Sequence, residues 1–248
     1  MTTGKHLLVI GGTSDIGHAV ALRYAEAGWH ISLAARDPDA ARRNADDIAA
    51  RAGTEISIHA LDILATDRLA GFVDGLPVLP DTVVCVVGEL SDQKRAEGDF
   101  ALAAAILRTN FEAPSLLLGR FAERFQTRGS GTIVGVSSVA GDRGRGSNYF
   151  YGAAKAGFSQ FLSGLRNRMT LAGKVRVVTV KPGFVRTRMT AGMKLPGALT
   201  VEPGIVGDAI FQAADGRLRD VIYVGNIWWL VMTVITAIPE TIFKRLRL

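Results

Sequence analysis

Cysteine is almost absent from this chain of 248 residues, since Cys85 is the only one. A single thiol excludes an intrachain disulfide, and its place in the apolar run TVVCVVG indicates inert packing. The start, MTTGKHLLVIGG, carries an apolar stretch that is too short for a signal peptide. Together these features predict a protein of the reducing cytoplasm.

Blocks of positive charge are also lacking. The net charge is +6, but the arginines and lysines are spread along the chain and do not alternate with aromatic residues. No nucleic-acid partner is therefore expected, and the excess favours solubility or attraction to anionic substrates, cofactors or lipid headgroups. The chain has no internal repeat, low-complexity tract or linker, and its 48% hydrophobic content predicts one domain with a sizeable core.

Short apolar runs rich in β-branched residues alternate with longer stretches of helical spacing. The runs are continuous, as in strands buried on both faces. We expect strands over 6–12, 30–36, 55–62, 82–88, 131–138, 174–183 and 220–225. We expect helices over 16–27, 38–51, 64–73, 101–127 and 149–171. This order predicts an α/β fold, a single-domain Rossmann-like doubly wound parallel sheet of about seven strands with helices on both faces.

A glycine-rich turn, VIGGTSDIGHAVA, follows the first expected strand and opens a helix. Gly11 permits the tight turn, and Gly17 lets the helix pack closely on the strand. Free backbone N–H groups and the helix dipole suit a dinucleotide pyrophosphate at this place. The candidate cofactor-binding residues of the turn are Gly11, Thr13, Ser14, Asp15, Ile16 and Gly17.

The end of the second expected strand, SLAARD, bears on the choice of coenzyme. No acidic residue precedes Arg36 to hold a ribose 2′-hydroxyl, and Arg36 can pair with a 2′-phosphate. Asp37 follows immediately and adds negative charge. The sequence therefore favours NADP(H), with NAD(H) as the alternative, in which case Arg36 is a solvated loop charge.

The stretch YFYGAAKAG holds Tyr151 and Lys155 four residues apart, on one face of a helix. A tyrosine with a pKa of about 10 is a poor acid–base at neutral pH, and a neighbouring ammonium lowers that pKa. Tyr151 can then donate a proton to a carbonyl oxygen that Ser138, at the end of the preceding strand, holds by a hydrogen bond. The spacing alone is also typical of an ordinary helix surface.

Five segments, GGTSDIG, LRTNF, GVSSVAG, YGAAK and VKPGFVRT, resemble in order and spacing the short-chain dehydrogenase/reductase family over nearly the full chain. The resemblance implies an NAD(P)-dependent oxidoreductase that interconverts carbonyl and alcohol groups without a metal. It implies a homodimer or homotetramer built through 101–127 and 149–171. It implies a catalytic tetrad of Asn110, Ser138, Tyr151 and Lys155, and further cofactor-binding residues at Asp62, Gly88, Tyr151, Lys155, Pro182, Gly183, Val185 and Thr187.

In that family the asparagine supports a proton-relaying water, the lysine also holds the nicotinamide ribose, and the Pro-Gly segment flanks the nicotinamide. Two departures stand out. Asp15 replaces the middle glycine of the cofactor turn, so its charge is expected near the pyrophosphate. The family's Asn-Asn-Ala-Gly segment is CVVG here, ending at Gly88, which removes the asparagine contacts expected on the adenosine side.

A narrower resemblance joins SSVAGDRGRGSNYFYGAAKAG, KPGFVRTRMT and IPETIFKRL to the reductase subunits of decaprenylphosphoryl-ribose 2′-epimerases. It implies reduction of the 2-keto group of a polyprenylphosphoryl pentose, as part of the cell-envelope chemistry begun by a flavin oxidase partner. Arginines suit phosphate recognition, and solvated loop cations are the plainer alternative. The candidate substrate-binding residues are Arg143, Arg145, Arg186, Arg188 and Met189.

Two other functions stay open. One is reduction of another apolar carbonyl, such as a 3-oxoacyl thioester or a small ketone, because the loop TRMTAGMKLPGALT also suits an acyl chain. The other is a non-catalytic dinucleotide-binding subunit, against which the complete tetrad argues.

The segment 227–248 is expected to differ in character from the catalytic domain, 1–226. After the last strand, IWWLVMTVITAI is twelve uncharged residues, too short to span a bilayer as a helix. Trp228, Trp229 and the basic ending KRLRL favour a peripheral contact with the inner face of the cell membrane. The alternative is packing on the same domain or in a subunit interface.

Overall fold

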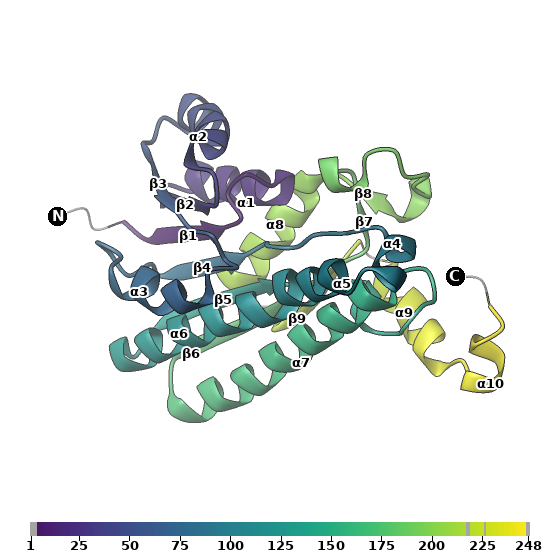
Figure 1. Ribbon diagram of the computed structural model, residues 1–248. Helices are drawn as coiled ribbons and strands as arrows, with labels where there is room; N and C mark the ends of the chain where they lie inside the picture. The colour runs from purple at the N-terminus through teal and green to yellow at the C-terminus, as the bar shows by residue number, and fades with distance from the viewer. Residues whose placement is uncertain (1–3, 217–218, 226, 247–248) are drawn as a thin grey trace.

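The computed structural model describes residues 4–216, 219–225 and 227–246. Within them, seven strands form one parallel sheet in the order β3-β2-β1-β4-β5-β6-β9 (Figure 1). The strands are β1 (His6–Ile10), β2 (His30–Ala35), β3 (Ile56–Ala60), β4 (Thr82–Cys85), β5 (Gly131–Val136), β6 (Val175–Pro182) and β9 (Val221–Val224). The predicted Rossmann-like fold is confirmed. The order reverses between β1 and β4, which is where such sheets bind dinucleotides.

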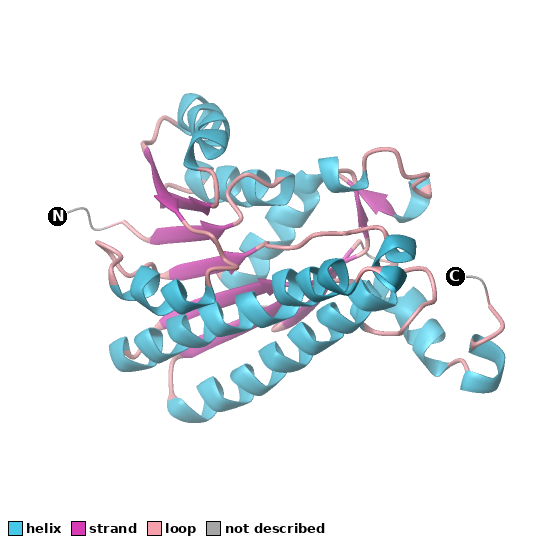
Figure 2. Ribbon diagram, viewed as in Figure 1, coloured by secondary structure: helices cyan, strands magenta, loops and turns pink. Residues whose placement is uncertain are grey.

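Helices cover both faces of the sheet, as Figure 2 shows in cyan around the magenta strands. One face carries α1 (Asp15–Glu26), α2 (Pro38–Ala52) and α8 (Pro203–Ala214). The other carries α3 (Leu69–Asp74), α6 (Ala113–Arg128) and α7 (Tyr149–Ala172). The remaining helices and turns are η1 (Thr66–Arg68), α4 (Gln93–Gly98), α5 (Phe100–Leu107), η2 (Arg108–Glu112), η3 (Val139–Gly141), η4 (Arg188–Thr190), η5 (Gly197–Leu199), α9 (Trp228–Ala237) and α10 (Glu240–Phe243).

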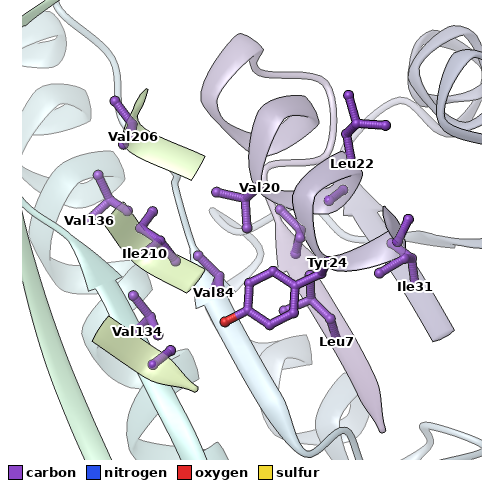
Figure 3. Packing of buried hydrophobic residues seen from close by; sticks show 14 of the residues in the cluster. Leu7, Val20, Leu22, Tyr24, Ile31, Val84, Val134, Val136, Val206 and Ile210 are labelled. Carbon is purple, nitrogen blue, oxygen red and sulfur yellow. The ribbon is translucent and has the colours of Figure 1, made fainter. Parts of the chain in front are cut away.

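The core beneath α1 and α8 shows why the continuous apolar strands are needed. In Figure 3, Val84 and Val134 of the sheet face Val20 of α1 and Ile210 of α8. The sequence analysis did not predict α8, although Val206 and Ile210 have the spacing of a helix face. This helix is required because the sheet face over β4 and β5 must be shielded from water.

The helix expected over 101–127 is interrupted at its middle. Arg108–Glu112 forms a π-helical turn between α5 and α6. Pro114 stands at the start of α6, and a proline ring clashes with the carbonyl four residues earlier in a regular α-helix. The wider turn accommodates this proline, and π turns of this kind are frequent at functional sites. Asn110 lies in it.

The C-terminal helices lie beside a small second sheet. There β7 (Phe184–Val185) pairs in parallel with β8 (Thr200–Val201). One face of α9 packs on the domain, since Trp228 and Met232 are buried against Val139. In Figure 1, α9 and α10 (yellow) extend outward from the same side of the molecule as β7 and β8. Among the described residues, no helix is both long enough and apolar enough to cross a membrane.

Candidate active site

The glycine-rich turn has the local geometry of a phosphate cradle. Ser14 caps α1, and its Oγ accepts the backbone N–H of Gly17 at 2.9 Å. Gly11 has φ +97°, and a Cβ on Gly17 would lie 2.6 Å from the Gly11 carbonyl oxygen. Because larger residues cannot close this turn, the open N–H groups of the first helical turn are left facing the carboxyl ends of the strands. The residues present therefore fit a dinucleotide pyrophosphate.

Asp15, which replaces a family glycine, is neutralised within the protein. Its carboxylate accepts the Arg188 backbone N–H at 2.7 Å and the Arg188 Nε–H at 2.9 Å. The Arg188 Nη2 also donates to the carbonyl of Thr13. The negative charge of Asp15, expected beside the pyrophosphate, is therefore paired with the positive charge of Arg188, which lies in the segment after β7.

A pocket on the adenosine side is lined by Gly11, Thr13, Ser14, Arg36, Asp62 and Gly88. Asp37 does not line this pocket, and its Oδ1 caps α2 by accepting the N–H groups of Asp39 and Ala40, both at 3.0 Å. Arg36 is exposed and forms no ion pair among the described residues. Asp62 accepts the N–H of Leu64 at 3.0 Å, which fixes its carboxylate at the pocket edge.

Asn110 is fully buried, and the chain after β4 holds its amide. Its Nδ2 donates to the carbonyls of Glu89 (3.0 Å) and Ile106 (2.9 Å), while its Oδ1 accepts the Glu89 N–H at 3.1 Å. A Cβ on Gly88 would lie 3.0 Å from Asn110 Oδ1 and 3.1 Å from Lys155 Nζ. Glycine at this position therefore lets the amide and the ammonium approach the same stretch of backbone.

Lys155 is the buried cation of the site, with 3% of its surface exposed. Its Nζ donates to the carbonyls of Val136 (3.2 Å) and Val87 (3.3 Å). Burial lowers the pKa of Lys155 to about 8, partly opposed by the nearby Cys85. The ammonium lies 5.8 Å from the centroid of the Tyr151 ring, one helical turn away on α7.

Burial raises the pKa of the Tyr151 phenol, and the neighbouring Ser138 side chain opposes this rise only in part. The sequence analysis expected Lys155 to lower this pKa; in the structure desolvation outweighs any such effect. The Tyr151 phenol therefore keeps its proton at neutral pH and is available as a donor.

One open pocket brings Ser138, Tyr151 and Lys155 together, whereas Asn110 is not among its lining residues. Its lining includes Ile16, Gly88, Ser138, Tyr151, Lys155, Pro182, Gly183, Val185, Thr187 and Met189, all predicted from the sequence. It shares Val86 and Gly88 with the adenosine-side pocket, so the two form neighbouring parts of one cleft. Among the described residues, no group of three or more metal-ligating side chains is gathered.

The four arginines predicted to bind substrate lie in different environments. Arg143 pairs with Glu240 at 2.6 Å, Arg186 with Glu202 at 2.8 Å, and Arg188 with Asp15 at 2.9 Å. These three do not line the pocket that holds Tyr151, whereas Arg145 does. Direct contact of all four arginines with a substrate phosphate stays a prediction, and carboxylates of the fold pair with three of them.

Several pocket residues were missed by the sequence analysis, and Trp228 is the clearest. Trp228 was expected at a membrane interface, but it is 4% exposed and its Nε1–H donates to the Leu199 carbonyl at 3.0 Å. A Cβ on Gly183 would lie 1.9 Å from its ring, so Gly183 makes room for the indole. The other missed lining residues include Leu90, Asn148, Phe184 and Met193, which belong to no short motif.

Comparisons with known proteins agree with this architecture. The family model described as short chain dehydrogenase matches residues 5–195. The chain therefore belongs to the short-chain dehydrogenase/reductase family and is an oxidoreductase with an NAD(P)-binding Rossmann-like fold.

Individual relatives extend the match to the whole chain. An uncharacterized oxidoreductase of Mycobacterium tuberculosis is 37% identical over 99% of this chain and 98% of its own length. A 3-oxoacyl-[acyl-carrier-protein] reductase of Chlamydia muridarum is 26% identical over 78% of this chain and 79% of its own. The crystal structure of a short-chain type dehydrogenase/reductase from Mycobacterium marinum has a TM-score of 0.81 and 25% identity, covering 91% of this chain and 95% of its own.

Proposed function

We propose that this oxidoreductase reduces a ketone to an alcohol with NAD(P)H, using Tyr151 as the proton donor. One observation carries the proposal: the hydroxyls of Ser138 and Tyr151 and the buried ammonium of Lys155 line one pocket beside the glycine-rich turn. Hydroxyl and ammonium groups that converge in a mostly apolar pocket are typical of a catalytic site.

The roles follow from the chemistry of each group. The reduced nicotinamide supplies a hydride to the carbonyl carbon. Ser138 donates a hydrogen bond to the carbonyl oxygen and holds it in place, while the protonated Tyr151 delivers its proton to that oxygen. The Lys155 ammonium stabilises the phenolate that remains, and it is positioned to hold the nicotinamide ribose.

Asn110 supports the return of the proton. Its amide is held by Glu89 and Ile106 of the protein, and it lies close to the same Gly88 backbone as Lys155. A water between Asn110 and Lys155 would link the ammonium to solvent, as the family resemblance implies. Reprotonation of Tyr151 then proceeds through Lys155 rather than directly from bulk water.

The coenzyme is proposed to be NADP(H). Arg36 lines the adenosine-side pocket without an ion-pair partner among the described residues, and Asp37 is engaged in capping α2. A free guanidinium at this place suits a 2′-phosphate.

The substrate is proposed to be the 2-keto form of a polyprenylphosphoryl pentose, made by a flavin oxidase partner. The support is the narrower resemblance, together with a pocket edge of Met189, Met193 and Trp228 that suits a prenyl chain. A 3-oxoacyl thioester is the second candidate, because a 3-oxoacyl-carrier reductase is among the relatives and the same edge suits an acyl chain. Rates on the two substrate types, at equal enzyme concentration, distinguish them.

Two exposed surfaces support the proposed partners. Leu107, Phe111 and Leu116 are exposed on α5, η2 and α6, where subunit contacts in a homodimer or homotetramer are expected. On α9, Trp229 and Leu230 are exposed, and the basic residues Lys244 and Arg245 follow α10; both features suit a peripheral contact with anionic lipid at the cytoplasmic side. The cytoplasmic location is itself a prediction.

The test of the function is the substitution Tyr151→Phe. It removes the hydroxyl and leaves the ring, so reduction should fall roughly 10²–10⁴-fold, the usual size of a general-acid contribution. NADPH affinity, measured by fluorescence titration, should stay within about twofold, because the substitution keeps the Tyr151 ring at the cofactor site and the lost hydroxyl is proposed to act mainly in proton transfer. Near-normal turnover of Tyr151→Phe would show that the proton comes from another group.

A further inference from the structure

Arg145 is the one predicted substrate-contacting arginine that lines the catalytic pocket. It lies in the loop between η3 and α7, and its side chain is half-buried beneath α9. Its Nη2 approaches only the soft Met232 Sδ, at 3.9 Å, and its Nε is buried without an acceptor in the described part of the chain. The guanidinium therefore brings charge into the pocket without a matching anion.

The nearest carboxylate does not satisfy this charge. Asp142 attracts Arg145 electrostatically but is already bonded on both oxygens. Its Oδ1 accepts Lys181 Nζ at 2.5 Å, and its Oδ2 accepts the Tyr223 hydroxyl at 2.8 Å. Burial lowers the pKa of Arg145, which reflects the cost of keeping a cation where few partners exist.

Asn148, three residues further along, shows a similar shortage. Its Oδ1 is buried and has no hydrogen-bond partner among the described residues, and it lines the same pocket as Tyr151. Buried polar groups in proteins are nearly always paired, so orphans gathered in a pocket point to a ligand. Here the pair offers an unused cationic donor and an unused neutral acceptor.

The surrounding surface indicates what else the ligand carries. Met189 and Met193 line the pocket with 46% and 45% of their surfaces exposed, and Trp228 lines the same pocket. Methionine and tryptophan side chains adapt to an apolar chain that runs from the pocket toward solvent. Arg145 and Asn148 line the same pocket and are more buried than these methionines.

We infer that Arg145 and Asn148 form a subsite that binds a phosphate group carried on an apolar chain, with Arg145 pairing with the phosphate oxygens and Asn148 accepting a hydroxyl next to it. A guanidinium offers two parallel N–H donors to such an oxyanion. This inference rests on the proposed function, because it assigns part of the same pocket to the substrate. It makes Arg145 a specificity residue, distinct from the proton-transfer groups.

The test is a binding titration that does not depend on turnover. Calorimetry on the NADP⁺-saturated protein measures the affinity for decyl phosphate and for decanol of wild type, Arg145→Met and, as a matched control, Arg42→Met, which changes an exposed arginine of α2 near Asp39. We expect Arg145→Met to weaken the binding of decyl phosphate about 10- to 100-fold, the size of a lost hydrogen bond to a charged group, and to leave the binding of decanol unchanged. Arg42→Met should bind both as wild type does.

A second variant distinguishes loss of the subsite from a folding defect of Arg145→Met. Asn148→Asp keeps Arg145 but places a carboxylate beside it, so it should also weaken decyl phosphate while its thermal midpoint stays near that of wild type. Equal binding of decyl phosphate by wild type and both variants overturns the subsite. Equal affinity for inorganic phosphate and decyl phosphate overturns the role of the apolar chain.

The outcome is separable from that of the proposed function. Tyr151→Phe should bind decyl phosphate normally even though it does not reduce a ketone. If reduction proves independent of Tyr151 while decyl phosphate still depends on Arg145, the subsite stands and the catalytic assignment falls. If reduction depends on Tyr151 while decyl phosphate binding does not depend on Arg145, the subsite falls and the catalytic assignment stands.

Discussion

At the scale of single residues, Lys155 combines two properties that conflict in water. It must stay charged to stabilise a phenolate, yet burial lowers its pKa to about 8 from an ordinary value near 10.5. The unfolded chain holds this proton more tightly than the folded protein does. The free energy of unfolding should therefore increase as the pH rises from about 8 to 10.5. The catalytic charge is lost over the same range.

Reduction is therefore expected to decline with pH on an ionisation close to the pKa of Lys155, about 8. Tyr151, whose pKa burial raises, stays protonated there and does not set this limb. The measurement is kcat/KM for ketone reduction from pH 6 to 10, with Lys155→Arg as the control that keeps its charge. A limb that stays at the same pH in Lys155→Arg would assign it to another group.

Arg36 is the residue on which coenzyme choice is predicted to depend. Arg36→Ala should lower the ratio of kcat/KM for NADPH over NADH by about 10- to 100-fold, since a charge-assisted contact with the 2′-phosphate is lost. Arg42→Ala, an exposed arginine of α2, is the matched control and should leave the ratio unchanged. A wild-type preference for NADH that Arg36→Ala does not alter refutes this role.

At the scale of elements, the Asp15–Arg188 pair connects the start of α1 to the turn η4, although the two residues are 173 positions apart. Arg188 is largely exposed, so the pair itself adds little to stability. Its effect is expected on the cofactor, because the glycine-rich turn borders both side chains. Without Arg188, a pyrophosphate in the glycine-rich turn would meet only the negative charge of Asp15. The ion pair places the positive charge of Arg188 beside it.

Asp15→Asn should tighten NADP⁺ binding several-fold, because it removes the negative charge and frees Arg188 for the pyrophosphate. The double variant Asp15→Asn/Arg188→Met should lose most of that gain. Dissociation constants from titration of the single and double variants give the coupling between the two positions. Weaker binding by Asp15→Asn would mean instead that the carboxylate is needed to shape the turn.

At the scale of the whole molecule, the apolar residues of α9 lie on two sides, one packed against the domain and one exposed. Trp228 and Met232 pack on the domain, whereas Trp229, Leu230 and Val234 are exposed. Consecutive helical residues lie about 100° apart around the axis, so neighbouring tryptophans cannot both face the core. The exposed side, with the basic residues after α10, is the surface proposed to contact lipid.

Trp229→Ser/Leu230→Ser should abolish co-sedimentation with liposomes rich in anionic phosphatidylglycerol while leaving the fold intact. Leu171→Ser, which changes an 82% exposed leucine at the far end of α7, is the matched control and should bind as wild type does. Substitutions are preferable to removing the segment 227–248, since that would also remove Trp228 from the pocket. Wild-type protein that ignores these liposomes contradicts the membrane contact.

Local patterns in the sequence were enough to predict the large sheet and the glycine-rich turn, and to single out Ser138, Tyr151 and Lys155. Continuous β-branched runs select buried parallel strands, and glycines mark turns that a Cβ would block. The seven predicted strands differ from those of the large sheet only at their ends, whereas the two short strands β7 and β8 were not predicted. Spacing within one helix also fixed that Tyr151 and Lys155 share a face, because this relation depends on local geometry alone.

Only the tertiary structure decided which charges remain available to a ligand. Arg188 is engaged by Asp15 and Arg143 by Glu240, while Arg145 is left without a carboxylate partner among the described residues. These outcomes depend on which distant segments the fold brings within about 4 Å, the range of an ion pair. No short stretch of sequence contains that information. The same reason kept the buried Trp228 from being foreseen, since its place follows from the space that Gly183 leaves open.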